Sequence, residues 1–120
     1  MKLKEICKLF NCEVLSAPAD YEELEIEYVG ASDLMSDVLA FGKPGMLLIT
    51  GLNSPQAVRS ASVIGASAVL IVRKDTVPES TTYLAKELGL ALLHARISMF
   101  RACGELYKFG LKDPITKEDS

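Results

Sequence analysis

The spacing of apolar residues changes along the chain and divides its first part into short predicted elements. Residues 2–10 carry apolar side chains three or four positions apart, which predicts a helix, and residues 12–15 predict a short strand. The loop predicted over 16–20 contains Pro18. From residue 23 to 28, apolar residues alternate with glutamates, which predicts a strand with one buried and one solvated face.

The stretch VGASDLMSDVLA, residues 29–40, raises the question of a functional site. Asp33 and Asp37 lie four positions apart and would share one face of a helix predicted over 33–41. The apolar stripe of this helix consists of Leu34, Met35, Val38 and Leu39. Ser32 or Asp33 suits the N-cap, and a helix dipole favours acidic residues in the first turn. We expect one aspartate to cap the helix and the other to be solvated. Two carboxylates alone make a weak metal site, so no metal site is predicted here.

Short apolar runs and helical periods alternate regularly in the rest of the chain. Strands are predicted at 46–50, 68–72 and 90–93, and helices at 54–64, 78–88 and 97–109. The run AVLIV is apolar on both faces, as in a buried parallel strand. In the last helix, Ile97, Phe100, Gly104 and Tyr107 are predicted to face inward. The β-α-β-α-β-α order with short connections predicts an α/β domain with three layers, in which helices flank a mainly parallel sheet.

Composition and charge limit the functions that such a domain can have. A chain of 120 residues with 49% apolar residues is expected to form one domain over residues 1–111, followed by a flexible tail over 112–120. The net charge of −3, with lysines and arginines spread along the chain, argues against a nucleic-acid partner. The sequence lacks both a signal peptide and an apolar run of membrane-span length, so we expect a cytoplasmic location and no membrane partner.

The residues that bear chemistry are few. Three cysteines without a CxxC pattern are expected to be reduced thiols, and with a single histidine they are too scattered to predict a metal site. Motifs for phosphate loops, dinucleotides and nucleophilic serines are missing from the sequence, so no cofactor and no catalytic residue is predicted. An enzyme that uses Asp33, Asp37 and His94 is the least favoured alternative, because perturbed acids also need a cleft.

A ligand site is predicted at one edge of the sheet, because parallel sheets bind ligands beyond the carboxyl ends of their strands. The candidate residues at this edge are Gly30, Ser32, Asp33, Thr50, Asn53, Ser54, Arg73 and His94. The helix start at Ser54 would favour an anion, and Arg73 would add positive charge, which points to a nucleotide or another anionic metabolite. Each residue also has a structural interpretation: Thr50, Asn53 and Ser54 as helix caps, His94 as a core histidine and Arg73 as a solvated side chain.

Several stretches resemble the DRTGG domain family. They are MKLKEICKLFNCEVLS, YVGASDLMSDVLA, GKPGMLLITG, AVLIV and LLHARISMFRACGELYKFGL, which together span about residues 1–111. The most specific part is ASDLMSDVL. The peptide that names the family is missing: EIEYVG, with one glycine, stands in its place.

The resemblance implies a regulatory module without catalysis. DRTGG domains occur beside CBS domains in some pyrophosphatases and in some phosphate acetyltransferases, and they are similar in fold to the N-terminal domain of HPr kinase. A module of this kind would be a homodimer that senses a metabolite or regulates a partner protein, such as a metabolic enzyme or a signalling protein. The family's motif positions fall on Gly30, Ser32, Asp33, Ser36 and Asp37, as a structural signature with a binding role. Apolar surface on the front strands and on the 29–41 helix is expected to form the dimer face.

Overall fold

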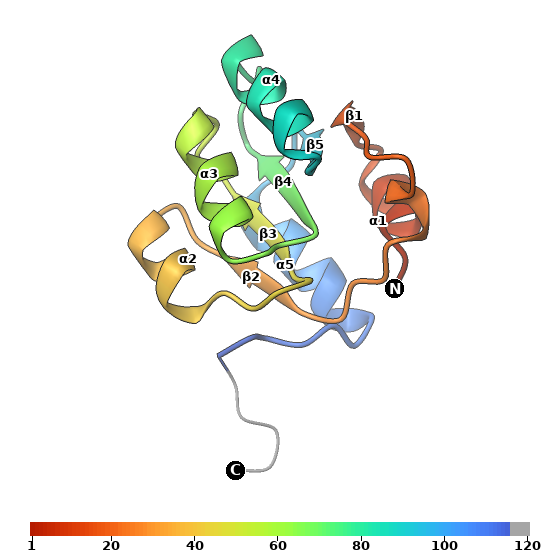
Figure 1. Ribbon diagram of the computed structural model, residues 1–120. Coiled ribbons are helices and arrows are strands. Elements are labelled where there is room, and N and C mark those ends of the chain that lie inside the picture. The colour runs from red at the N-terminus through yellow and green to blue at the C-terminus, as the bar shows by residue number, and fades with distance from the viewer. Residues whose placement is uncertain (116–120) are drawn as a thin grey trace.

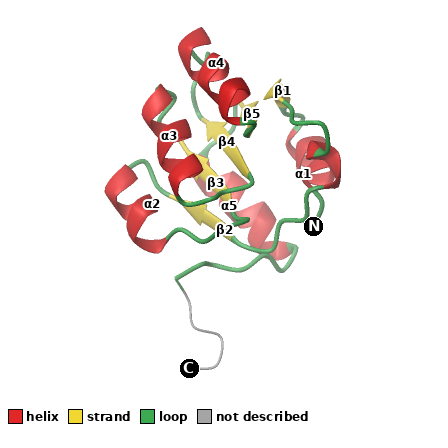
Figure 2. Cartoon of the chain, viewed as in Figure 1, coloured by secondary structure: helices red, strands yellow, loops and turns green. Residues whose placement is uncertain are grey.

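The computed structural model describes residues 1–115, which form a five-stranded sheet with helices on both faces (Figures 1 and 2). The α-helices are α1 (Leu3–Phe10), α2 (Met35–Phe41), α3 (Pro55–Val63), α4 (Glu79–Leu88) and α5 (Met99–Lys108). The strands are β1 (Glu13–Ser16), β2 (Val29–Ala31), β3 (Leu47–Thr50), β4 (Ala68–Val72) and β5 (Ala91–Ala95). A 3₁₀ turn, η1, covers Tyr21–Glu23. The α/β fold with a mainly parallel, helix-flanked sheet is therefore confirmed.

The strand order is β1-β5-β4-β3-β2, in which only the pairing of β1 with β5 is antiparallel. Every residue of β3, β4 and β5 is buried, as the apolar runs predict for strands covered on both sides. Helices α1 and α5 pack on one face of the sheet, and α2, α3 and α4 pack on the other. All four parallel strands end at the same edge, which we call the carboxyl edge.

The strand predicted over residues 23–28 is wrong. Glu23 ends the 3₁₀ turn, and the extended residues after it make only isolated bridges, Glu25 with Lys2 and Tyr28 with Lys112. Buried and exposed side chains nevertheless alternate in this segment, since Ile26 is buried and the glutamates are exposed. The segment crosses the N-terminus of α1 instead of extending the sheet: the amide of Ile26 donates to the Met1 carbonyl at 2.8 Å.

The helix predicted from Asp33 begins two residues later, at Met35, because residues 29–31 belong to β2. Leu34 occupies its N-cap position. Met35 and Val38 are buried as predicted, whereas Leu34 and Leu39 remain 59% and 50% exposed. The core thus covers only part of the predicted apolar stripe of α2.

The face predicted for the last helix is also wrong. Phe100 and Tyr107 are 90% and 78% exposed, whereas Ala102 and Leu106 are buried. The helix begins at Met99, where the Ser98 hydroxyl accepts a 3.1 Å hydrogen bond from the Arg101 amide. Helix α5 therefore carries two apolar faces, and the small side chain of Ala102 marks the one that packs close to the sheet.

The first residues of the predicted tail lie along the open edge of β2. The Lys112 amide donates to the Glu27 backbone carbonyl at 2.9 Å, and the Lys112 carbonyl accepts from the Val29 amide at 2.9 Å. Pro114 is buried. Residues 116–120 of that tail lie outside the described residues.

Candidate functional site

The carboxylate of Asp33 is the centre of a polar cluster at the carboxyl edge. The chain leaves β2 at Ala31 and brings Asp33 to the loop after β3. Its Oδ1 accepts a 2.6 Å hydrogen bond from the Gly51 amide and a 3.4 Å bond from the Thr50 hydroxyl. Its Oδ2 lies 2.5 Å from Nη2 of Arg73. We call these three donors, Thr50, Gly51 and Arg73, the Asp33 cradle.

Backbone features at two positions make this cluster possible. A Cβ built on Gly51 would lie 2.1 Å from Nη1 of Arg73, so the guanidinium occupies the space that a side chain there would fill. Arg73 itself adopts a left-handed conformation with φ of 54°, which non-glycine residues seldom adopt. Its amide donates to the Ile97 carbonyl at 2.8 Å, which holds this turn against the loop before α5. The guanidinium is therefore placed by backbone contacts on both sides.

The electrostatics of the cluster favour its charged form. The hydrogen bond from Arg73, supported by the Gly51 amide, lowers the pKa of Asp33 against the opposing effect of burial. The same carboxylate raises the pKa of Arg73. Both side chains are nearly half exposed, at 43% and 45%, so water screens the pair and a solute can reach it.

The other candidates at this edge mainly hold loops in place. The Asn53 side chain donates to the Thr76 carbonyl at 3.0 Å, and the Asn53 backbone carbonyl accepts from the Thr81 hydroxyl at 2.7 Å. Ser54 occupies the N-cap position of α3 and Pro55 follows in its first turn, as predicted, but the Ser54 side chain makes no capping hydrogen bond. Ser32 accepts from the Leu34 amide at 3.0 Å, which shapes the turn into α2. These residues thus have structural contacts, although none of their side chains caps α3.

His94 is a buried residue of β5, and its side chain is 2% exposed. Its Nε2 donates to the Lys74 carbonyl at 2.6 Å, and its Nδ1 lies 3.7 Å from Oε1 of Glu13 on β1. Glu13 is on β1 and Lys74 follows β4, whereas Asp33 is bound by Thr50, Gly51 and Arg73. Asp37 is exposed on α2. The structure therefore does not assemble a catalytic set from Asp33, Asp37 and His94.

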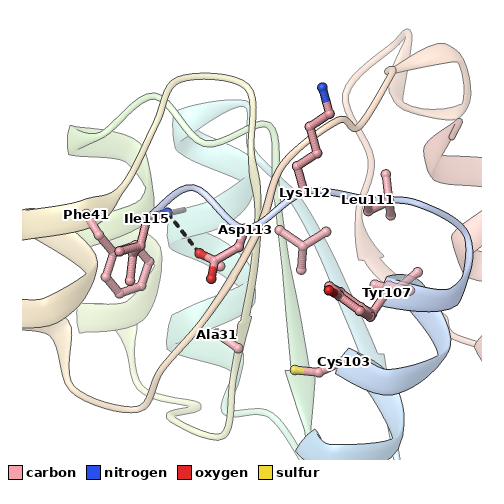
Figure 3. A pocket seen from close by; sticks show the side chains of 11 residues that line it. Ala31, Phe41, Cys103, Tyr107, Leu111, Lys112, Asp113 and Ile115 are labelled. Carbon is pink, nitrogen blue, oxygen red and sulfur yellow. Dashed lines mark hydrogen bonds between the residues drawn. The ribbon is translucent and has the colours of Figure 1, made fainter. Parts of the chain in front are cut away.

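Gly30 lines a separate pocket of about 280 Å³ beside β2 (Figure 3). The pocket lies between β2, α5 and the segment from 111 to 115. A Cβ at Gly30 would come within 2.7 Å of the Phe41 ring, so the glycine lets this ring approach the strand. Sequence reasoning missed the pocket, because its walls come from elements far apart in the chain and only Gly30 was a candidate. The pocket is lined by Val29, Gly30, Ala31, Phe41, Cys103, Leu106, Tyr107, Leu111, Lys112, Asp113 and Ile115.

Residues 1–115 contain no group of three or more His, Cys, Asp or Glu side chains that could hold a metal ion. Within the same residues, every helix is too short or too polar to cross a membrane.

Comparisons with known proteins place the fold. The chain is similar to a solved structure of the CBS and DRTGG domains in the regulatory region of Clostridium perfringens pyrophosphatase, complexed with its activator diadenosine tetraphosphate. The TM-score is 0.73 at 16% sequence identity, over 86% of this chain and 44% of that one. The chain thus spans less than half of that structure, and the likeness supports a DRTGG-like fold. No protein-family model and no curated protein matches the sequence.

Proposed function

We propose that this protein is a non-catalytic regulatory module whose carboxyl edge responds to an anionic metabolite such as a nucleotide. The observation that carries the proposal is the Asp33 cradle. A backbone amide, a hydroxyl and a guanidinium converge on one carboxylate, and the same donors bind phosphate or carboxylate groups of ligands. The pyrophosphatase regulatory region with a similar fold, which was solved with the activator diadenosine tetraphosphate, supports the proposal by analogy.

In this proposal the Asp33 carboxylate fills the anion site when no ligand is bound. An incoming phosphate replaces the Asp33 carboxylate on Arg73 and on the Gly51 amide. The displaced aspartate releases the turn between β2 and α2, because its bonds tie that turn to the loops after β3 and β4. Ligand binding is thereby coupled to the position of α2, and that position is the signal a partner protein would read.

The test is to measure binding of ATP and of inorganic phosphate by isothermal titration. In Asp33→Ala the competing carboxylate is gone, so affinity should rise about two- to fivefold, the range of an exposed ion pair of up to ~1 kcal/mol. In Arg73→Gln binding should be lost. Gly51→Ala should also weaken it, since the new methyl group displaces the guanidinium while both charges remain.

Arg59→Gln is the matched control, because Arg59 is an exposed arginine on α3. Equal losses in Arg59→Gln and Arg73→Gln would show unspecific attraction of anions. Absence of binding to wild type and to Asp33→Ala at millimolar ligand would overturn the anion site.

A second candidate function, protein interaction as a homodimer, is favoured by the outer face of α5. Phe100 and Tyr107 lie seven residues apart, with Cys103 and Gly104 between them, so large exposed rings flank a low centre of small residues. Exposed aromatic patches of this kind mark interaction sites, and a two-fold pair of α5 helices would place each ring beside the partner's small residues.

Sedimentation velocity at micromolar concentration tests the dimer. Wild type should sediment as a dimer, and Phe100→Ser with Tyr107→Ser as a monomer. Tyr83→Ser, which changes a ring 64% exposed on α4, should remain dimeric. Leu34→Ser with Leu39→Ser tests the α2 face instead, and dissociation by that pair alone would place the dimer there. A strictly monomeric wild type would contradict the dimer.

A further inference from the structure

Two cysteines meet at the C-terminal end of α1. Asn11 adopts a left-handed conformation with φ of 51°, and its amide donates to the Lys8 carbonyl at 3.3 Å. The Cys12 amide donates to the Cys7 carbonyl at 2.9 Å. These two bonds form a Schellman motif, a helix ending that commonly brings the side chains of its first and last residues into contact. Here the two side chains are the thiols of Cys7 and Cys12.

The two thiols shift each other's acidity in opposite directions. The neighbouring Cys12 thiol lowers the pKa of Cys7, and the Cys7 thiol, together with burial, raises the pKa of Cys12. Both residues are partly exposed and lie at the margin of the core cluster that α1 shares with the sheet. A small reagent can therefore reach them, and Cys7 is the thiol that forms a thiolate first.

We propose that Cys7 and Cys12 form a modification site that is oxidised to an intramolecular disulfide by a low-molecular-weight disulfide of the glutathione type. The Cys7 thiolate attacks one sulfur of the reagent, which makes a mixed disulfide and releases one reagent thiolate. Cys12 then loses its proton to water and attacks the Cys7 sulfur, and the second reagent thiol leaves. Two protein thiols are oxidised and one reagent disulfide is reduced to two thiols.

Backbone geometry favours closure of this ring over reaction with another chain. The hydrogen bonds of the motif already hold the two residues together, so the second step is intramolecular and needs little rearrangement. The third cysteine, Cys103, is on α5, where burial raises the pKa of its thiol. It serves as an internal comparison for the reaction.

The modification would fix the junction between α1 and β1. Only Cys12 separates the left-handed Asn11 from β1, which is an edge strand of the sheet. A bond across this turn restricts the end of α1 in the oxidised protein. The module would thus carry a redox input that is separate from the carboxyl edge.

The experiment is intact-mass spectrometry of the reduced chain after incubation with graded ratios of oxidised to reduced glutathione. Wild type and Cys103→Ser should both lose about 2 Da without a glutathione adduct, because a disulfide forms with loss of two hydrogen atoms. Cys12→Ser should instead accumulate a glutathione adduct on Cys7, and Cys7→Ser should form its adduct more slowly. Circular dichroism of each variant confirms that it remains folded.

Three outcomes would overturn the proposal. One is a mass loss that survives in Cys7→Ser or Cys12→Ser. Another is a disulfide-linked dimer of the wild type on a non-reducing gel, in place of the internal bond. The third concerns the ratio of oxidised to reduced glutathione at which the disulfide forms. If the folded protein needs a more oxidising ratio than the protein unfolded in urea, the fold does not favour the disulfide.

Discussion

At the scale of single residues, the role of Asp33 is set by its tertiary partners. The sequence around it has the composition of a helix start, and an aspartate there was expected to cap the helix. The structure gives its carboxylate an amide, a hydroxyl and a guanidinium from the loops after β3 and β4. A charge-assisted bond to arginine is stronger than a neutral cap bond, so the longer-range partners prevail.

The pH dependence of stability should reveal this pairing. Because the pKa of Asp33 is lowered in the folded state, the pair stabilises the protein above the unfolded value of about 3.9, and this contribution is lost as the pH falls through the folded value. We expect Asp33→Asn to cost up to ~1 kcal/mol of unfolding free energy at pH 7, since the pair is half exposed. The difference from wild type should begin to shrink below about pH 4 and keep shrinking as the pH falls to about 3.

Urea unfolding at pH 7, 5, 4 and 3 measures this difference. Asp37→Asn removes an exposed carboxylate from α2 and is the matched control. A difference that stays constant down to pH 3 would assign the effect of Asp33→Asn to packing instead of charge.

At the scale of elements, α5 shows why periodicity identifies a helix without fixing which face is buried. Apolar residues recur at helical spacing on both of its sides, so the pattern with the larger rings, Phe100 and Tyr107, was the more prominent one. The sheet covers the other side, which Ala102 and Leu106 provide. A helix can approach a sheet most closely where it carries a small side chain, and burial of the leucine then stabilises that contact.

Substitutions on the two faces of α5 should therefore differ in cost. Leu106→Ala, at a side chain 1% exposed, should lower the unfolding free energy by about 2–4 kcal/mol through loss of contacts and a cavity. Phe100→Ala should change it by less than about 0.5 kcal/mol, because the ring is 90% exposed. Chemical denaturation of both variants at low protein concentration measures the difference. A larger loss for Phe100→Ala would contradict the assignment of the buried face.

At the scale of the whole molecule, the fold was largely predictable and the site only partly so. The runs at β3, β4 and β5 are apolar on both faces and are separated by short helices, and few architectures satisfy such a chain. The Asp33 cradle combines donors at the ends of β3 and β4 with a carboxylate from the turn after β2. The sequence could place these residues at one edge of the sheet but could not show which of them bind each other. Tertiary packing decides whether Asp33 caps a helix or pairs with arginine. It also decides which face of α5 is buried, and local sequence patterns encode neither outcome.

Both margins of the sheet are closed to further strands. On one side, β1 is four residues long and its register with β5 shifts between Val14 and Ser16. On the other side, Lys112 already makes backbone hydrogen bonds along β2. Pro114 has no amide hydrogen, so it cannot donate a further hydrogen bond to this edge. Short, irregular or proline-terminated margins discourage strand-by-strand growth. If the chain dimerises as proposed, the contact should form through helices and close on itself, and concentrated solutions should resist fibre formation.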